Sequence, residues 1–544
     1  LQAFQRLSGQ TKKAPFPKQL IDVTPRSVQA LRRPVSVSQA SQSAPPATHT
    51  AKLPATDSTL IGRDRELARL NSAWESGANF IQIIAPGGTG KTALMTRWYK
   101  QLVGNVPILG YSFYRQGTVS SDSAGGASDG KVSSDEFLNL AMGWLHLTPA
   151  ANTADAKIAA LVDHLRAHRT LLILDGLEPL QDPWNGDLRD FALKDLLREL
   201  ATQNAGFVLC TTRVRLSDIP EEQAALALDL DNLTEEDGAR YLTEKFGVYG
   251  SEVDIRAASR EYGNHALALT LLGSYLKRQG GDVSRRVEIR HFPSSDPRYG
   301  KSSEHAARVM QSYASEFSGK PEGEILCALG FFDRPAERSA LKLVIKGKLN
   351  GDALVALQEV RLVFTEGPLS PIDCHPLVRE HFSRLVKSMN PEGFREGHSL
   401  LFDHYSKLPK HLPNSLEEMT PLFHAVSHGC LAGRHVEVLN EIYLARILRG
   451  SPAFYLTRNL GAFGTNLALL SNFFEAPWHQ PIQILPSANR SWLLTTTAFT
   501  LRALGRLTEA VDPWRLGAEA IVVDQDWLGA AVAYNNLSEL LLAL

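Results

Sequence analysis

The stretch IIAPGGTGKTALM, residues 83–95, decides how the region around it folds. An apolar run typical of a strand ends in a glycine-rich turn, and Lys91 and Thr92 then begin a pattern typical of a helix. This order suits a phosphate-binding loop, because backbone N–H groups and the positive end of a helix can surround a phosphate. Ala85 stands where the usual eight-residue pattern has its first glycine, and a small residue still fits where strand becomes loop.

The residues of this stretch have expected roles at a bound nucleotide. Lys91 would neutralise the β- and γ-phosphates, and the hydroxyl of Thr92 would hold Mg²⁺. Four successive backbone N–H groups would wrap the terminal phosphate, those of Gly87, Gly88, Thr89 and Gly90. The alternative is a glycine-rich turn that binds nothing. The apolar strand before the loop and the helix after it favour the phosphate-binding interpretation.

Length, charge and composition describe an ordinary globular protein of several domains. A chain of 544 residues exceeds what one hydrophobic core organises, so about three to five domains are expected. The net charge of −1 gives no global basic field for nucleic acid, and no run reaches the roughly 18 apolar residues of a membrane span. The chain begins with Leu and without a signal segment, which predicts a piece of a longer, cytoplasmic protein. Four widely spaced cysteines predict free thiols in a reducing compartment: Cys210, Cys327, Cys374 and Cys430.

Strand-like runs alternate with helical patterns around the loop. A helix is expected over residues 59–74, and four apolar strands are expected at 80–85, 106–114, 170–177 and 206–213. Continuous apolar strands separated by helices predict a parallel sheet covered on both faces. Residues 34–56 are rich in Ser, Ala, Pro and Thr and have no apolar periodicity, so they predict a flexible linker.

Two later strands of this region end in charged residues that complete the candidate site. Asp175 ends the buried strand LLILD and would hold Mg²⁺ through a water, and Glu178 on the following turn would orient or deprotonate the attacking water. A structural salt bridge is the alternative for Glu178. Arg213 ends the strand VLCTTR and would sense the γ-phosphate, unless it is only a surface arginine. Arg115 is a weaker candidate of the same kind.

The second half of the chain is predicted to be helical. Thr234, with Asp237 three residues later, is a suitable helix start. A compact segment at about 320–388 ends in strand-like pieces around LVFTEG and IDCHPLV, and helices fill the rest. TLRALG at 500–505 and ELLLAL at 539–544 occupy similar places about 40 residues apart, which suggests helix-pair repeats of the tetratricopeptide kind.

Taken together, these motifs resemble the STAND class of signal-transduction ATPases, which includes the NB-ARC domains of plant disease-resistance proteins and animal apoptosis ATPases. The resemblance runs from about residue 60 to 390, in family order, over LIGRDREL, APGGTGKT, LLILDGLEPLQ, TTR, GNHALALTLLGSYL and HPLVREHF. Several of these phrases look most like bacterial members that carry an effector domain ahead of the ATPase.

The resemblance implies a multidomain fold. It predicts a P-loop α/β domain with a parallel sheet, a small helical domain over the nucleotide, a winged-helix domain and all-helical TPR-like repeats. The expected bounds are 1–58 for a helix tail and linker from an absent effector, 59–230 for the P-loop domain, 231–300 for the helical lid, 301–390 for the winged helix and 391–544 for a truncated sensor array.

The resemblance also implies further nucleotide contacts. Ile61, Gly62 and Arg63 would lie by the adenine. His375 matches the family's winged-helix histidine, which reaches the β-phosphate of ADP and locks the closed state. Ala266 stands where the family usually has a proline that contacts the nucleotide, and Pro376 stands where plant members have Asp, so only the histidine is carried over.

The function implied is a slow ATPase that uses ATP/ADP and Mg²⁺ as a conformational switch. ADP would favour a compact state and ATP or a trigger an open, self-associating one. The C-terminal helices would bind an unknown protein or small-molecule trigger, and the effector would act in bacterial antiviral defence. No membrane contact is expected and nucleic acid is an unlikely partner. The alternatives are a DNA-binding transcription regulator of the same class and an unrelated P-loop enzyme such as a kinase.

Overall fold

The computed structural model describes residues 47–54, 60–116, 132–182, 185–219, 225–289, 301–365, 367–450 and 453–544, without the side chains of 115–116 and 301–304. The predicted helix tail and most of the predicted linker lie outside these residues, and so does the side chain of Arg115.

A six-stranded sheet in the order β1-β3-β4-β5-β2-β6 forms the centre of the P-loop domain. Every neighbouring pair is parallel. The strands are β1 (Thr48–Lys52), β2 (Phe80–Ile84), β3 (Ile108–Ser112), β4 (Leu171–Asp175), β5 (Phe207–Thr212) and β6 (Ala225–Asp229). The four predicted strands and the predicted parallel sheet are therefore confirmed, and β1 and β6 are additional.

Strand β1 corrects the prediction of a flexible linker over 34–56. Its residues pair with β3, Thr48 opposite Ile108 and His49 opposite Leu109. An edge strand needs only one neighbour, and polar side chains are common along such edges. Thr, His and Lys therefore formed a strand here without the apolar pattern that would have revealed it.

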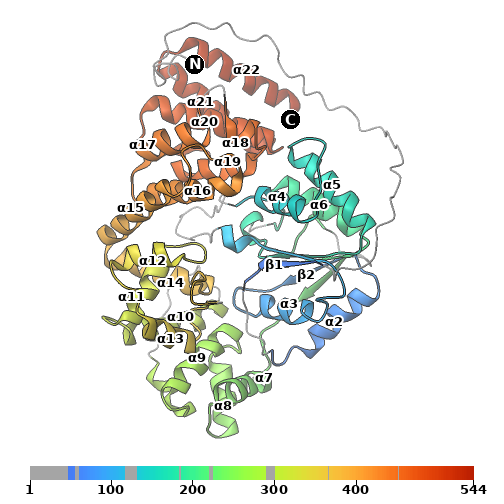
Figure 1. Ribbon diagram of the computed structural model, residues 1–544, viewed down its shortest axis with the longest axis vertical. Helices are drawn as coiled ribbons and strands as arrows, with labels where there is room; N and C mark the ends of the chain where they lie inside the picture. Colours follow the sequence, from blue (N-terminus) through green and yellow to red (C-terminus); the bar gives the residue numbers. More distant parts are fainter. Residues whose placement is uncertain are drawn as a thin grey trace.

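Helices cover both faces of the sheet (Figure 1). Below it in that view lie α2 (Asp64–Glu75) and α3 (Lys91–Tyr99), and above it lie α4 (Asp135–Trp144), α5 (Ala154–Ala167) and α6 (Phe191–Thr202). Each layer has its own apolar core: Leu94 and Trp98 pack beneath the strands, and Leu161 and Leu196 pack above them. Burial on both faces explains why the central strands are mostly apolar and do not alternate with polar residues.

Two helical units follow the sheet along the chain. The first holds α7 (Glu235–Arg240), α8 (Glu252–Glu261) and α9 (Ala266–Arg278), and Thr234 caps α7 as predicted, accepting from the Asp237 N–H at 3.0 Å. The second holds α10 (Lys301–Glu316), α11 (Pro321–Leu329), α12 (Arg338–Ile345), α13 (Gly351–Glu359) and α14 (Pro376–Met389). Between α13 and α14, Phe364 pairs antiparallel with Asp373, so the strand-like pieces expected there are present.

The remaining chain is almost entirely helical, as predicted. It comprises α15 (Pro391–Lys407), α16 (Leu416–Leu431), α17 (His435–Glu437), α18 (Tyr455–Arg458), α19 (Phe463–Leu470), α20 (Ser487–Ala503), α21 (Leu507–Val523) and α22 (Trp527–Ala543), with a short hairpin of β7 (Phe474–Ala476) and β8 (Gln480–Pro481). α22 repeats the position of α20 after 40 residues, from Ser487 to Trp527, which fits the predicted repeat.

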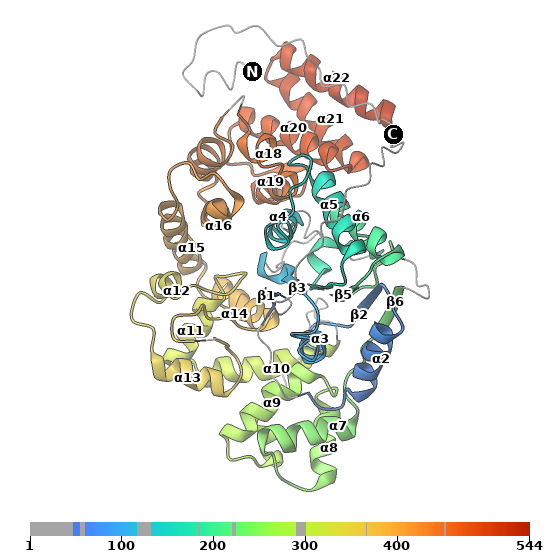
Figure 2. The same cartoon turned by 45° about the vertical axis from the view of Figure 1, so that its right-hand side comes forward.

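The helical units follow one another around the sheet domain. Figure 2 shows α7–α9 at the bottom, α11–α13 at the left, and α15–α22 rising from the left to the top. Among these last helices α19 contacts α4 of the sheet domain. No helix in the described ranges is long and apolar enough to cross a membrane. The chain thus has a multidomain fold, with a P-loop α/β domain followed by helical domains.

Candidate nucleotide site

The glycine-rich loop joins β2 to α3 at the carboxyl edge of the sheet. Gly88 and Gly90 have φ values of +82° and +108°, a region that glycine adopts without strain. Ala85 continues the sheet instead: its N–H donates to the Thr212 carbonyl at 3.1 Å, and its φ is not positive. The glycine missing from the motif is therefore not required by the backbone at this position.

Lys91 turns back onto its own loop. Its Nζ donates to the carbonyls of Ala85 at 2.6 Å and Pro86 at 3.2 Å, and lies 3.6 Å from Glu178 Oε1. Burial lowers the pKa of Lys91, and the charge of Glu178 acts in the opposite direction. A buried cation held mainly by carbonyls gains from an added anion, so the site favours a phosphate group beside Lys91.

Asp175 ends β4 and accepts hydrogen bonds from three hydroxyls. Its Oδ1 accepts from Thr211 at 2.7 Å and Thr92 at 3.1 Å, and its Oδ2 accepts from Ser112 at 3.1 Å. Complete burial raises the pKa of Asp175, although the hydroxyls favour its charged form. The structure brings together Thr92 and Asp175, the two residues predicted to hold Mg²⁺.

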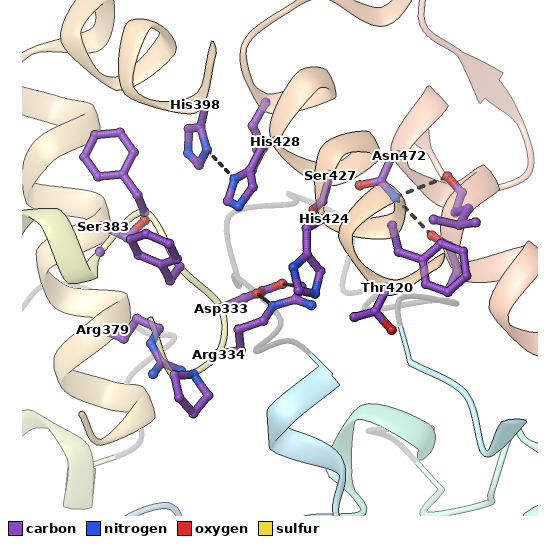
Figure 3. Close-up of a pocket in the computed structure, with 18 of the residues that line it drawn as sticks. Asp333, Arg334, Arg379, Ser383, His398, Thr420, His424, Ser427, His428 and Asn472 are labelled. Carbon is purple, nitrogen blue, oxygen red and sulfur yellow. Dashed lines mark hydrogen bonds and ion pairs between the residues drawn. The ribbon is translucent and has the colours of Figure 1, made fainter. Parts of the chain in front are cut away.

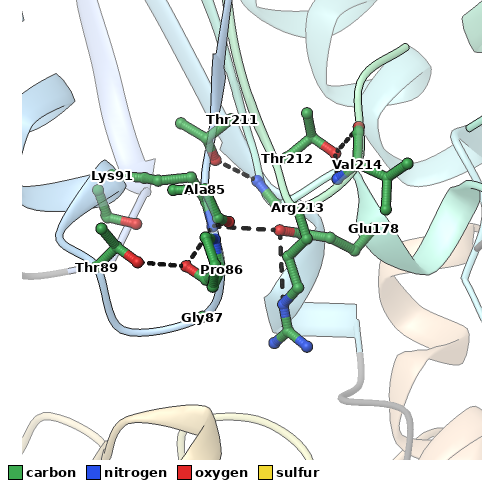
Figure 4. A network of polar contacts seen from close by, with 12 residues as sticks. Ala85, Pro86, Gly87, Thr89, Lys91, Glu178, Thr211, Thr212, Arg213 and Val214 are labelled. Carbon is green, nitrogen blue, oxygen red and sulfur yellow. Dashed lines mark hydrogen bonds and ion pairs between the residues drawn. The ribbon is translucent and has the colours of Figure 1, made fainter. Parts of the chain in front are cut away.

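Glu178 and Arg213 lie on the other side of the loop (Figure 4). Arg213 Nε is 3.8 Å from Glu178 Oε1, and a methyl group added at Gly87 would lie 3.3 Å from Arg213 Nη2. Glu178 is 13% exposed and Arg213 is 44% exposed. Neither carboxylate oxygen of Glu178 has a hydrogen-bond partner among the described residues. Glu178 forms ion pairs with both Lys91 and Arg213, which is the salt-bridge alternative, and its role toward an attacking water stays a prediction.

His265, at the start of α9, contacts the loop directly and was missed by the sequence analysis. Its Nε2 lies 2.9 Å from the Gly87 carbonyl, while its Nδ1 accepts from the Ala268 N–H at 3.3 Å. Because Nδ1 is an acceptor, the ring proton lies on Nε2, which donates to the loop. Burial lowers the pKa of His265 to about 4, which keeps the ring neutral. The Leu267 N–H adds a second bond, to the Gly88 carbonyl at 3.0 Å.

The signal for this contact was present in the sequence GNHALAL. Within this stretch Ala266 replaces the proline that the family usually has, and His265 directly precedes it. The backbone around Ala266 still reaches the loop, since its Cβ would lie 4.0 Å from a methyl group at Gly90. A histidine at a helix start is an unusual cap, and that alone could have indicated a polar contact at this position.

His375, at the start of α14, is brought to the same site from the second helical unit. Its Nδ1 caps α14, accepting from the Leu377 N–H at 3.2 Å. Burial, followed by the nearby His265, Arg213 and Lys91, lowers the pKa of His375 to about 3. The charges of Arg213 and Lys91 act on the ring, so His375 lies near the glycine-rich loop, and its contact with a β-phosphate stays a prediction.

The segment predicted to lie by the adenine, residues 61–63, contacts the glycine-rich loop through Arg63. Arg63 Nη2 donates to the carbonyls of Thr89 at 3.2 Å and Asp231 at 2.8 Å. Gly62 has a φ of +68° and lies so close to Asp237 that a side chain would collide with it. Ile61 is buried in the apolar core shared with the small helical unit. Adenine contact by Ile61, Gly62 and Arg63 stays a prediction.

The donor set fits a nucleotide with Mg²⁺. Lys91 and the loop N–H groups would hold phosphates, Thr92 and Asp175 would hold the metal, and the carboxylate oxygens of Glu178, which accept no hydrogen bond from the described residues, would accept from a water. Bound Mg²⁺ would supply charge neutralisation on the phosphates.

Comparisons with known proteins extend this description. No protein-family model matches the sequence, and no curated protein matches it. Among solved structures, the chain is similar to a Signal Transduction ATPase with Numerous Domains (STAND) protein with a tetratricopeptide repeat sensor from Pyrococcus horikoshii, at 15% identity and a TM-score of 0.49, over 90% of this chain and 69% of that chain. It is also similar to a Walker-type ATPase of Pyrococcus abyssi, at 13% identity and a TM-score of 0.31, over 62% of this chain and 98% of that chain. The loop between β2 and α3, on a parallel sheet, gives this chain the fold of a P-loop ATPase followed by helical domains.

Proposed function

We propose that this protein is a nucleotide-dependent conformational switch of the STAND class. One observation carries the proposal: two helical units that follow the sheet domain both converge on the glycine-rich loop. α9 binds the loop through His265 and the Gly87 carbonyl, and α14 places His375 beside it. A nucleotide in the loop would therefore touch three parts of the chain at once. Any ligand that contacts one arrangement better than another shifts the balance between them.

Slow ATP hydrolysis is part of the proposal. Glu178 would orient or deprotonate the attacking water, and Arg213 would stabilise charge on the γ-phosphate. Lys91 must leave the Ala85 carbonyl to reach a phosphate, and Glu178 must release its ion pairs. These rearrangements favour a protein that holds nucleotide for long periods and hydrolyses it slowly.

The proposed biological role of the switch is inferred from the order of the domains along the chain. We propose that the C-terminal helices bind a protein or small-molecule trigger, that the open state self-associates, and that an effector outside this sequence responds, in cytoplasmic bacterial antiviral defence. Stacked helix pairs present an extended surface for such a trigger. On the last helix, Trp527 and Leu528 are 68% and 67% exposed, which supports an interaction surface there.

Lys91→Ala tests the nucleotide function, with Lys100→Ala as the matched control. Lys100 follows the same helix and is exposed, so its removal changes the net charge equally without touching the loop. We expect Lys91→Ala to weaken fluorescent ADP and ATP binding at least about 100-fold, because a buried phosphate contact of about 3 kcal/mol is lost. Lys100→Ala should bind like the parent chain.

Unchanged nucleotide affinity in Lys91→Ala would contradict the proposal. Light scattering of the nucleotide-bound chain then tests self-association, which should be greater with ATP than with ADP. Tight duplex DNA binding that falls steeply with salt would instead favour the transcription-regulator alternative.

A further inference from the structure

A second cavity, of about 450 Å³, lies where the sheet domain, the second helical unit and the first C-terminal helices meet. Its walls come from α14, α15, α16 and α19, from the turn after α11, and from Lys52 and Glu136 of the sheet domain. None of its described lining residues belongs to the glycine-rich loop, residues 85–92. The volume falls within the range of small-molecule sites.

His424 on α16 is the unexplained group in this cavity. Its side chain is 8% exposed, and neither ring nitrogen has a hydrogen-bond partner in the described part of the chain. A buried polar group without a partner costs roughly 1–3 kcal/mol, so such groups are rare in folded proteins. The ring lies beside Asp333 and Arg334 (Figure 3). An imidazole held in this way is available to a ligand.

The charges around His424 favour an anion. Arg334 and Asp333 form a two-point ion pair, with Nε–Oδ1 at 2.6 Å and Nη2–Oδ2 at 2.9 Å. One face of α14 adds Arg379 and Lys387 at helical spacing. The lining holds five cationic side chains, Lys52, Arg334, Arg379, Arg384 and Lys387, and three acidic ones, Glu136, Asp333 and Glu380. Asp373, outside the lining, forms an ion pair with Arg379 at 2.6 Å, so the excess is one positive charge. Net positive charge in a partly closed space attracts an anionic group.

Apolar side chains also line the cavity. They are those of Phe331, Phe332, Phe423 and Leu431, and the hydroxyl residues Ser383, Thr420 and Ser427 line it as well. Phenylalanine rings suit the carbon skeleton of an organic molecule better than a hydrated inorganic ion. The lining therefore combines cationic side chains with aromatic ones that suit an apolar body.

We propose that this cavity binds a small organic anion, a phosphate or carboxylate group on an apolar body, with His424 and Arg334 at the anionic group. Burial, followed by the charge of Arg334, lowers the pKa of His424, and an anion would raise it again. The ligand would touch the sheet domain and both helical regions, so it would stabilise the arrangement in which they meet. α14 begins beside the nucleotide site. Farther along the same helix its residues line this cavity as far as Lys387, which lies about 18 Å from the start of the helix.

Calorimetric titration of the full chain tests the proposal with three probes of one size. Phenylphosphate and benzoate carry the two candidate anionic groups, and benzyl alcohol is the neutral control. We expect saturable binding of at least one anion with a Kd near or below about 1 mM, and at least tenfold weaker binding of the alcohol. Comparing the two anions identifies the preferred group.

Variants that fill the cavity locate the binding. Thr420→Trp should weaken anion binding at least tenfold, whereas Glu417→Trp, an exposed position on the same helix, should not. If Thr420→Trp does not fold, Ser427→Phe makes the same test about two turns farther along α16. Absence of saturable binding by either anion, equal binding of benzyl alcohol, or unchanged binding in a folded cavity-filling variant would overturn the proposal. Lys91→Ala should bind the anions normally, so failure here is distinct from failure of the nucleotide function.

Discussion

Two contacts between domains each include one buried titratable side chain, and the pKa shifts of the two side chains have opposite signs. At the loop, neutral His265 joins α9 to the Gly87 carbonyl, and burial lowers its pKa to about 4. At the other side of the sheet domain, Asp135 of α4 accepts from the N–H of Thr465 at 2.7 Å and from its hydroxyl at 3.0 Å. Burial raises the pKa of Asp135 to about 6.

Because the pKa of His265 is lowered and that of Asp135 is raised, a change of pH should strengthen one domain contact and weaken the other. When the contact between α9 and the loop is open, His265 binds a proton below its ordinary pKa of about 6.5, whereas in the closed contact it stays neutral until the pH approaches 4. Acid therefore weakens this contact as the pH falls from 6.5 towards 4. For Asp135 the closed form binds the proton first. Its contact strengthens as the pH falls from about 6 to 3.8, and that gain is lost as the pH rises again through 6.

The largest expected effect comes from the backbone beside the Asp135 contact. Gly461, just before α19, has a φ of +65°, and a methyl group there would lie 2.0 Å from the Asn152 carbonyl oxygen. Gly461→Ala should therefore weaken the α19 contact by about 3–5 kcal/mol, through overpacking and backbone strain together. Hydrogen exchange of α19, followed by mass spectrometry, measures this loss.

Gly433→Ala is the matched control for that change. Gly433 also has a positive φ, of +83°, but nothing lies within 4 Å of an added methyl group. It should cost only about 1–2 kcal/mol, the strain of the backbone alone. Equal losses in the two variants would show that the close approach of Gly461 to Asn152 contributes little to the domain contact.

The second prediction concerns the loop contact. His265→Ala removes both the cap of α9 and the bond to the Gly87 carbonyl, and it leaves a buried gap. We expect α9 to lose about 2–4 kcal/mol of protection against exchange. In His265→Asn the asparagine still caps α9 well, but its side chain is too short to reach the loop. This variant should therefore lose only the energy of the bond to the Gly87 carbonyl, which is the smaller part of the loss in His265→Ala. If both variants exchange like the parent chain, His265 does not hold α9 on the loop.

Much of the fold and of the loop site could be predicted because short segments encode them. The run LLILD is apolar at every position before its acid, so both the buried strand and the placement of Asp175 follow from neighbouring residues. The positions of Lys91, Thr92 and Arg213 could be predicted for the same reason, because each lies at the end of a predicted strand or of the glycine-rich loop. The role of Ala85 could also be judged, since its position only required a small residue.

Contacts between distant segments could not be predicted in this way. His265 meets Gly87 across 178 residues, and Asp135 meets Thr465 across 330. Their pairing depends on how whole domains pack, which no local pattern records. Strand β1 was missed for a related reason, because it is the edge strand of the sheet, pairs there with β3, and has mostly polar side chains.

The smallest predicted effect is the pH dependence that separates the two contacts. We expect hydrogen exchange, corrected for intrinsic rates, to change in opposite directions in the two helices between pH 7.5 and 5. At about 1.4 kcal/mol for each pKa unit crossed, α9 should lose about 2 kcal/mol of protection and α19 should gain about 1.4 kcal/mol. Asp135→Asn keeps an oxygen that can accept from Thr465 but cannot titrate, so α19 should become insensitive to pH while α9 still weakens in acid. If α19 keeps its pH response in Asp135→Asn, the titrating group is not Asp135. Parallel changes in α9 and α19 would instead mean that the two contacts open together, as one cooperative unit.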